Sequence, residues 1–72
     1  MTRYMVLLEH GETSWGVQVP DLPGCVAVAE SRDEALELIR EAIAFHIESL
    51  RQDGLPVPKP SSEIEFVEVE AA

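Results

Sequence analysis

Apolar and polar residues alternate along the first part of the chain. This is the spacing of β-strands, because successive side chains of a strand point to opposite faces. Residues 3–9 are apolar throughout their centre, so this first strand is predicted to lie in the middle of a sheet or in an interface. Residues 14–19 carry Trp15, Val17 and Val19 on one face. The polar, glycine-containing residues between the two strands predict a hairpin turn.

A rigid corner interrupts the alternation at Pro20-Asp21-Leu22-Pro23-Gly24. Proline fixes φ and lacks an amide donor, and glycine admits backbone angles closed to other residues, so no strand or helix continues through the corner. Alternation resumes in a third predicted strand, residues 25–30, where Cys25, Ala27 and Ala29 form a row of small side chains. Small side chains allow another element to pack closely, and the following helix is the obvious candidate.

Residues 32–53 show apolar positions at spacings of three and four, the period of an amphipathic helix. Ser31 and Glu34 predict a capping box at the start of this helix. Gly54 predicts a left-handed stop at its end.

The predicted helix carries an apolar stripe that should face the sheet. Its members are Leu36, Ile39, Ile43, Ile47 and Leu50. Leu38 and Phe45 lie beside this stripe and widen the apolar arc. We interpret these two residues either as a contact with another subunit or partner, or as a thick edge of the core.

A proline-rich segment, residues 55–62, follows the helix and predicts an extended crossover to a last strand, residues 63–70. In this strand Ile64 and Phe66 share one face, whereas Val67 and Val69 lie on the opposite face. Either a bulge corrects the phase, or the two halves pack on different surfaces, one of which belongs to another chain. Four interleaved glutamates would also discourage uncontrolled edge pairing.

The order of elements is β-β-β-α-β, which predicts the α+β class in a single domain, residues 1–72, with one long helix on one face of a four-stranded sheet. The right-handed crossover rule places the last strand parallel to a nonadjacent earlier strand. A domain of this size buries a modest fraction of its surface, so association with a second copy is expected to add stability.

The net charge limits the classes of function that this protein can have. Five basic residues against 14 acidic residues give a net charge of −9, which disfavours nucleic-acid binding and suits either a basic partner or simple solubility. The single cysteine forms no intrachain disulfide, and the start of the chain lacks the features of a signal peptide. No apolar run is long enough to span a membrane. We therefore expect a cytoplasmic protein.

Residues able to carry chemistry are scattered. A nuclease of the ribonuclease H type needs carboxylates that converge on magnesium, yet the centre of the first predicted strand is apolar. Cys25 and His46 have no third group to orient them, and Cys25 fits better as a small core residue. The two histidines and one cysteine lack the short spacing of a metal site. We predict no enzyme activity, no cofactor and no metal.

The segment from Trp15 through Pro20-Asp21-Leu22-Pro23-Gly24-Cys25, followed by Ser31-Arg32-Asp33-Glu34-Ala35, resembles the HicB-like antitoxin family. Members of that family carry an aromatic strand, a P-D-L-P-G-C type turn and a [ST]-x-x-E-A helix start. The resemblance implies a partial ribonuclease H-like fold with strand order 3-2-1-4. Many members continue into a DNA-binding domain, for which this chain is expected to have no room.

The resemblance implies an antitoxin that occludes a small basic toxin of the HicA type, an RNA-cleaving protein. The expected partner-binding residues are Trp15, Asp21, Glu65, Glu68 and Glu70, and for Trp15 a purely structural role is favoured. The expected contacts within a dimer or tetramer are Leu38, Phe45, Val67 and Val69. Two other hypotheses are a self-associating regulatory module without a toxin and, less favoured, a degenerate nuclease.

Overall fold

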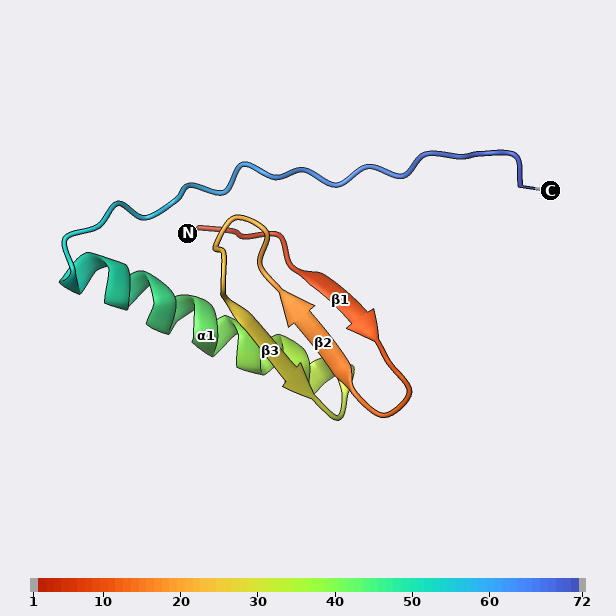
Figure 1. Cartoon of the computed structure of the whole chain (residues 1–72), viewed down its shortest axis with the longest axis horizontal. Coiled ribbons are helices and arrows are strands. Elements are labelled where there is room, and N and C mark those ends of the chain that lie inside the picture. The colour runs from red at the N-terminus through yellow and green to blue at the C-terminus, as the bar shows by residue number, and fades with distance from the viewer. Residues whose placement is uncertain (1, 72) are drawn as a thin grey trace.

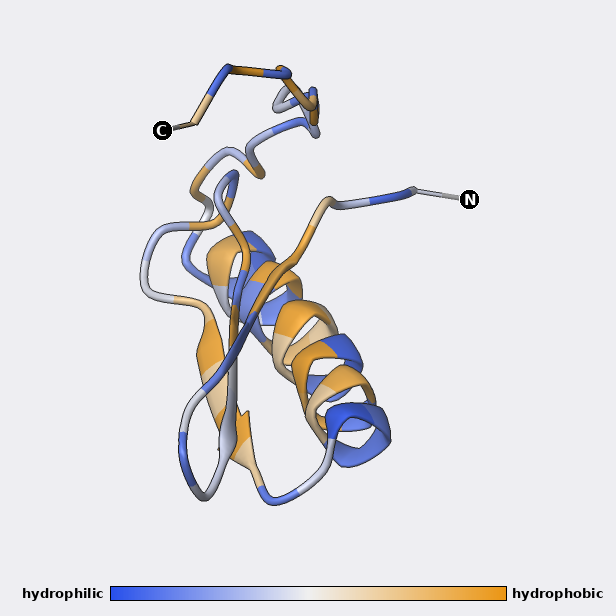
Figure 2. Cartoon of the chain, turned by 90° about the vertical axis from the view of Figure 1, so that its right-hand side faces the viewer, coloured by the Kyte–Doolittle hydropathy of each residue, from blue (hydrophilic) through white to orange (hydrophobic). Residues whose placement is uncertain are grey.

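The computed structural model describes residues 2–71. Within these residues three antiparallel strands form one sheet in the order β1-β2-β3, and one long helix covers one of its faces (Figure 1). The elements are β1 (Leu7–His10), β2 (Trp15–Gln18), β3 (Val26–Ala29) and α1 (Arg32–Gln52). Figure 2 shows the sheet and the helix as two layers. The predicted α+β class and the long helix are confirmed.

The strands are shorter than the alternation predicted. β1 begins at Leu7 and includes His10, which the sequence assigned to the turn. The hairpin between β1 and β2 closes with a hydrogen bond from the Gly11 amide to the Ser14 carbonyl, at 2.8 Å. The stretch from residue 3 to residue 6 is not a strand because its backbone pairs with no neighbouring strand in the described part of the chain.

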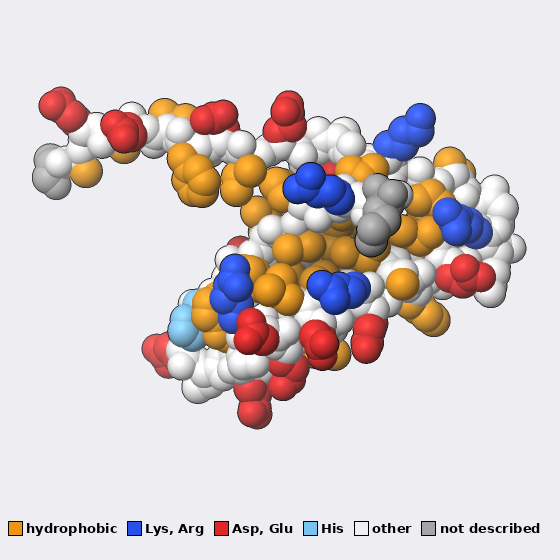
Figure 3. Space-filling view, turned by 180° about the vertical axis from the view of Figure 1, so that it is seen from behind, with side chains coloured by type: hydrophobic (Ala, Val, Ile, Leu, Met, Phe, Trp, Pro, Cys, Tyr) orange, Lys and Arg blue, Asp and Glu red, His pale blue; other side chains and the backbone are white. Residues whose placement is uncertain are grey.

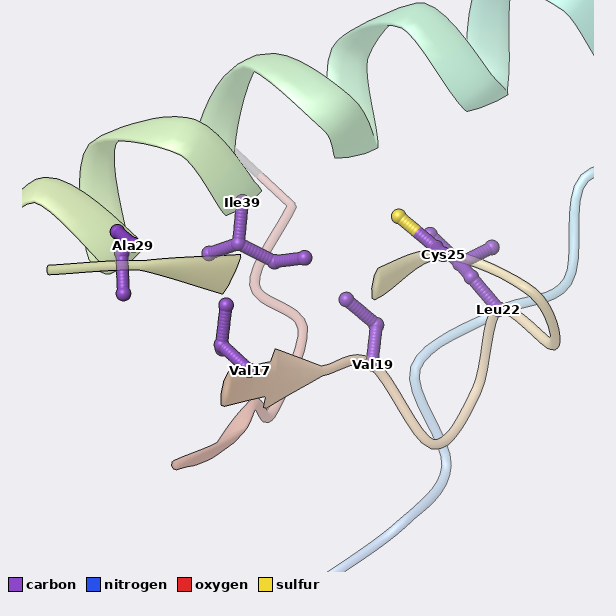
Figure 4. Close-up of a cluster of buried hydrophobic side chains, with 7 residues drawn as sticks. Val17, Val19, Leu22, Cys25, Ala29 and Ile39 are labelled. Atoms are coloured by element: carbon purple, nitrogen blue, oxygen red, sulfur yellow. The ribbon is translucent and has the colours of Figure 1, made fainter. Parts of the chain in front are cut away.

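The core lies between the sheet and α1 (Figure 4). Its buried residues are Val17, Val19, Leu22, Cys25, Ala29, Ala35 and Ile39. The row of small residues in β3 faces the helix as predicted, because Cys25 and Ala29 are buried whereas Val26 and Val28 are exposed on the other face. Close approach of α1 to the sheet therefore depends on these small side chains.

The proline-rich corner is part of this core. Leu22 turns inward from it and is fully buried. Successive backbone hydrogen bonds join Val19, Leu22 and Cys25 at 3.0–3.1 Å and close the turn. Gly24 has φ of +86°, a left-handed conformation that favours glycine.

Both predicted ends of α1 are confirmed. The Ser31 hydroxyl accepts a hydrogen bond from the Glu34 amide at 3.1 Å, which caps the first turn. At the other end Gly54 adopts φ of +70° and its amide donates to the Arg51 carbonyl. Along the predicted stripe Ile39 is buried, and Leu36, Ile43, Ile47 and Leu50 are half-buried.

The fourth strand is the main difference from the predicted architecture. Residues 63–70 are extended and exposed, and they pair with no strand among the described residues. β1 consequently lies at an edge of the sheet, not in its middle. In Figure 1 the blue C-terminal segment runs back past the N-terminus and then leaves the rest of the molecule.

Candidate partner-binding surface

The C-terminal segment is attached to the proline-rich corner at one point, the Asp21 carboxylate. The amides of Ser61 and Ser62 each donate to Oδ2 at 3.0 Å. The two serine hydroxyls donate to Oδ1, at 3.2 Å for Ser61 and 2.7 Å for Ser62. Both oxygens of this carboxylate are therefore engaged by the segment that follows the prolines.

These hydrogen bonds hold the pKa of Asp21 below its ordinary value of 3.8. The Ser62 hydroxyl is the largest cause, followed by the Ser62 amide. Donors directed at a carboxylate stabilise its charged form. Asp21 was predicted to bind a partner. In the structure its carboxylate forms an attachment within the chain, and its contact with a partner stays a prediction.

A second contact lies just before this attachment. The Tyr4 hydroxyl donates to the Pro58 carbonyl at 2.6 Å. Because Tyr4 also packs against the core, the proline-rich segment is tied to the body of the protein at two separate places. We call residues 63–70, which follow these contacts, the tail.

The tail exposes most of its apolar surface. The exposed fractions are 62% for Ile64, 86% for Phe66, 77% for Val67 and 80% for Val69. The predicted partner-binding glutamates, Glu65, Glu68 and Glu70, are exposed between them. Because large apolar side chains rarely stand this exposed in a row, the tail is a candidate contact surface.

Trp15 lies at the opposite end of the sheet from the tail's attachment. It is half-buried against the core, and its ring stacks on His10 with centroids 4.1 Å apart and planes 6° from parallel. The structure therefore does not place Trp15 and the predicted glutamates on one continuous surface. Its contacts fit the structural alternative for this residue.

The two apolar residues beside the helix stripe are exposed. Phe45 is 75% exposed and Leu38 is 37% exposed. A position that is three-quarters exposed is not the edge of a core, so the structure contradicts that alternative for Phe45. Their predicted contact with another subunit stays a prediction.

The open face of the sheet was not predicted from the sequence. Leu7, Val26 and Val28 lie on the face away from α1 and border a shallow hollow of about 200 Å³. The alternation in β3 indicated that the two valines share a face, but it did not indicate that this face stays uncovered. That outcome depends on the single helix covering only the other side.

Cys25, the candidate nucleophile in the sequence, lies in the core. Cys25 is buried, and burial raises the pKa of its thiol, which disfavours the reactive thiolate. Among residues 2–71 no group of three or more histidine, cysteine or acidic residues is arranged to hold a metal ion. Over the same residues, no helix has the length and apolar character required to cross a bilayer.

Comparison with known proteins identifies the family. Residues 4–71 match the model of the HicB-like antitoxin of bacterial toxin–antitoxin systems. Antitoxin HicB 2 of Photorhabdus laumondii is 38% identical over 71 residues, which cover 97% of this chain and 51% of that protein. A UPF0150 protein of Thermoplasma acidophilum is 37% identical over 62 residues, which cover 85% of this chain and 90% of that protein.

A third relative is an uncharacterized 14.9 kDa protein of Haemophilus phage HP1. It is 39% identical over 56 residues, which cover 78% of this chain and 42% of the phage protein. The chain thus spans about half the length of the first relative and less than half of the phage protein. The chain belongs to the HicB-like antitoxin family, and the resemblance seen in its sequence is confirmed. This membership supports an antitoxin role.

Proposed function

We propose that this protein is the antitoxin of a small basic toxin of the HicA type, which it binds and occludes in the cytoplasm without catalysing a reaction. The family match over residues 4–71 is the observation that carries the proposal. The net charge of −9 supports it, because an acidic surface attracts a basic partner over long range.

The contact that we propose is made by the exposed glutamates of the tail, which lie on both of its faces. Glu65, Glu68 and Glu70 are exposed and lie beyond the attachment at Asp21, so they can approach a partner without disturbing the core. Asp21 acts in this proposal by holding the tail, rather than by touching the toxin. We also propose that residues 1–72 form the predicted single domain with a partial ribonuclease H-like topology.

Binding to a small basic toxin of the HicA type, sought in the reading frame beside this gene, tests the proposal. We expect the wild-type protein to bind the purified toxin and to stop its RNA cleavage. Replacement of Glu65, Glu68 and Glu70 by lysine should weaken binding by at least about tenfold, since each lost charge contact contributes roughly 0.5–1 kcal/mol. Replacement of Glu37, Glu41 and Glu48, which are exposed on α1, by lysine is the matched control.

Equal losses in the two triple variants would show that net charge alone attracts the toxin and that the tail is not the contact. Undiminished binding by the tail variant would eliminate the tail surface. If no neighbouring basic toxin binds the wild-type protein, the self-associating regulatory module replaces the antitoxin as the better account.

A further inference from the structure

An apolar groove lies between α1 and the N-terminal stretch, residues 2–6, that leads into β1. Thr2, Tyr4 and Val6 of the N-terminal stretch line one side of the groove. Leu36, Ile39, Arg40 and Ile43 of α1 line the other side. The groove has a volume of about 300 Å³. Figure 3 shows this side of the molecule, where an orange apolar area lies below the tail and is bordered by blue Lys and Arg side chains.

A fourth strand paired with β1 and with the residues before it would pass along this groove. β1 pairs with β2 on one side only, so the backbone donors and acceptors on its other side have no strand partner among the described residues. A further strand beside β1 would cover the half-buried Val6 and Leu36 and would give the order 3-2-1-4. An edge of this kind is a template for an added strand.

The tail has the length and the chemistry to fill the groove. Its eight residues extend over about 26 Å at about 3.3 Å per residue. Its apolar side chains match the apolar lining, and its glutamates match Arg40 in the groove wall. The start of the tail of the same chain lines a separate hollow beside residues 3–5, and Phe66 and Val67 beyond it are exposed.

The phase of the tail favours a second copy as its partner. Ile64 and Phe66 lie on one face of the extended tail and Val67 and Val69 on the other. A groove within one chain covers one of these faces and leaves the other in water. In an exchange between two copies, the second face can be covered where the two tails and the two bodies meet.

We propose that two copies exchange their tails, so that residues 63–70 of each chain lie in the groove beside β1 of the other. The exchange is symmetric, because the same segment and the same groove are used twice. The contacts of Asp21 with Ser61 and Ser62 are retained and direct each tail towards its partner. The proposal goes beyond toxin binding and does not depend on it.

Molecular mass in solution gives the first test. We expect the wild-type chain to sediment as a dimer and the double variant Phe66→Ser, Val67→Ser to sediment as a monomer, a twofold change in mass. Both residues are exposed in the single copy, so the variant should fold normally. The control is Val28→Ser, which removes a similarly exposed valine from the open sheet face and should leave the dimer intact. A monomeric wild type, or a dimer lost only in the control, would overturn the proposal.

Crosslinking separates exchange from folding back within one chain. A variant with Leu36→Cys and Phe66→Cys is treated with a short bismaleimide at low protein concentration, and Cys25 is shielded by its burial. Exchange predicts a covalent dimer in which the two new cysteines are linked. A crosslinked monomer would show that the tail occupies its own groove, and absence of a linked product would show that it occupies neither. The control pair, Val28→Cys with Phe66→Cys, should give no such dimer.

The two proposals fail independently. The glutamate variants retain the apolar side chains of the tail, and the Phe66 and Val67 variant retains all of its glutamates. The mass of the glutamate variants is therefore measured beside their toxin binding. A dimer that does not bind toxin contradicts the antitoxin proposal alone, whereas a monomer that binds toxin contradicts tail exchange alone.

Discussion

The body and the tail of this protein contain similar fractions of apolar residues but use them differently. In the body, from β1 to α1, small residues in β3 and the inward turn of Leu22 bring the sheet and the helix into contact, and the core is closed. In the tail, Phe66, Val67 and Val69 are at least 77% exposed within residues 2–71. Apolar residues therefore specify a core only where neighbouring elements can approach, and elsewhere they specify a surface for association.

The largest expected effect is on the free energy of unfolding, which should depend on a side chain in the body and not on one in the tail. Leu22→Ala removes a fully buried side chain and should lower the free energy of unfolding by about 2–5 kcal/mol. Phe66→Ala removes a larger side chain that is 86% exposed and should change it by less than about 0.5 kcal/mol in the single copy. Chemical denaturation at a concentration low enough to dissociate any dimer measures both. A large loss in Phe66→Ala would show that the tail belongs to the folded body.

The next effect concerns the start of α1. Ser31→Ala removes the hydroxyl that accepts the Glu34 amide and should lower the free energy of unfolding by about 1 kcal/mol. Thr13→Ala, in the exposed hairpin turn, removes a hydroxyl without affecting a helix and serves as the control. Thermal unfolding of the two variants makes the comparison. Equal destabilisation by both would mean that the cap contributes nothing specific.

The attachment of the tail should respond to a change that leaves the body intact. Asp21→Asn keeps the shape of the side chain but replaces one acceptor oxygen with a donor, so it cannot accept from both serine amides and both hydroxyls. We expect faster hydrogen exchange at Ser61 and Ser62 with little change in the melting temperature. Glu12→Gln, which removes a charge from the hairpin turn, should leave the exchange unchanged. Protection that persists in Asp21→Asn would show that other contacts hold the tail.

Low pH should detach the tail from Asp21, as Asp21→Asn does. Of the four predicted effects, this one is expected to be the smallest. The pKa of Asp21 is lowered when its carboxylate binds the two serines and is near 3.8 when they are detached. Attachment is therefore fully favoured above pH 3.8 and is lost as the pH falls through the lowered pKa. Hydrogen exchange at Ser62 should rise in this range in the wild type but not in Asp21→Asn. A parallel rise in both proteins would assign the change to other carboxylates.

The sequence predicted the body well because its signals are local. The capping serine, the glycine after α1 and the small residues of β3 each act on neighbours a few positions away, and all of them were confirmed. The bounds of β1 were less predictable, because apolar character alone does not determine which residues form backbone hydrogen bonds with a neighbouring strand.

The parts that escaped prediction involve distant partners. Asp21 and Ser62 are 41 positions apart, and no periodicity links a carboxylate in a turn to serines beyond a proline-rich segment. The fourth strand was predicted from its β-forming residues, but strand formation also requires an edge to pair with. The conflict of phase between Phe66 and Val67 was the one local sign that this segment packs differently from the rest.

Hydrogen exchange of residues 63–70 as a function of protein concentration tests most directly whether the tail serves for association. The account predicts rapid exchange in dilute solution, where single copies prevail, and protection that increases with concentration as tails pair beside β1 of a second copy. Protection that is already complete in dilute solution would contradict it, because the tail would then be a strand of its own sheet. Rapid exchange at every concentration would contradict it as well.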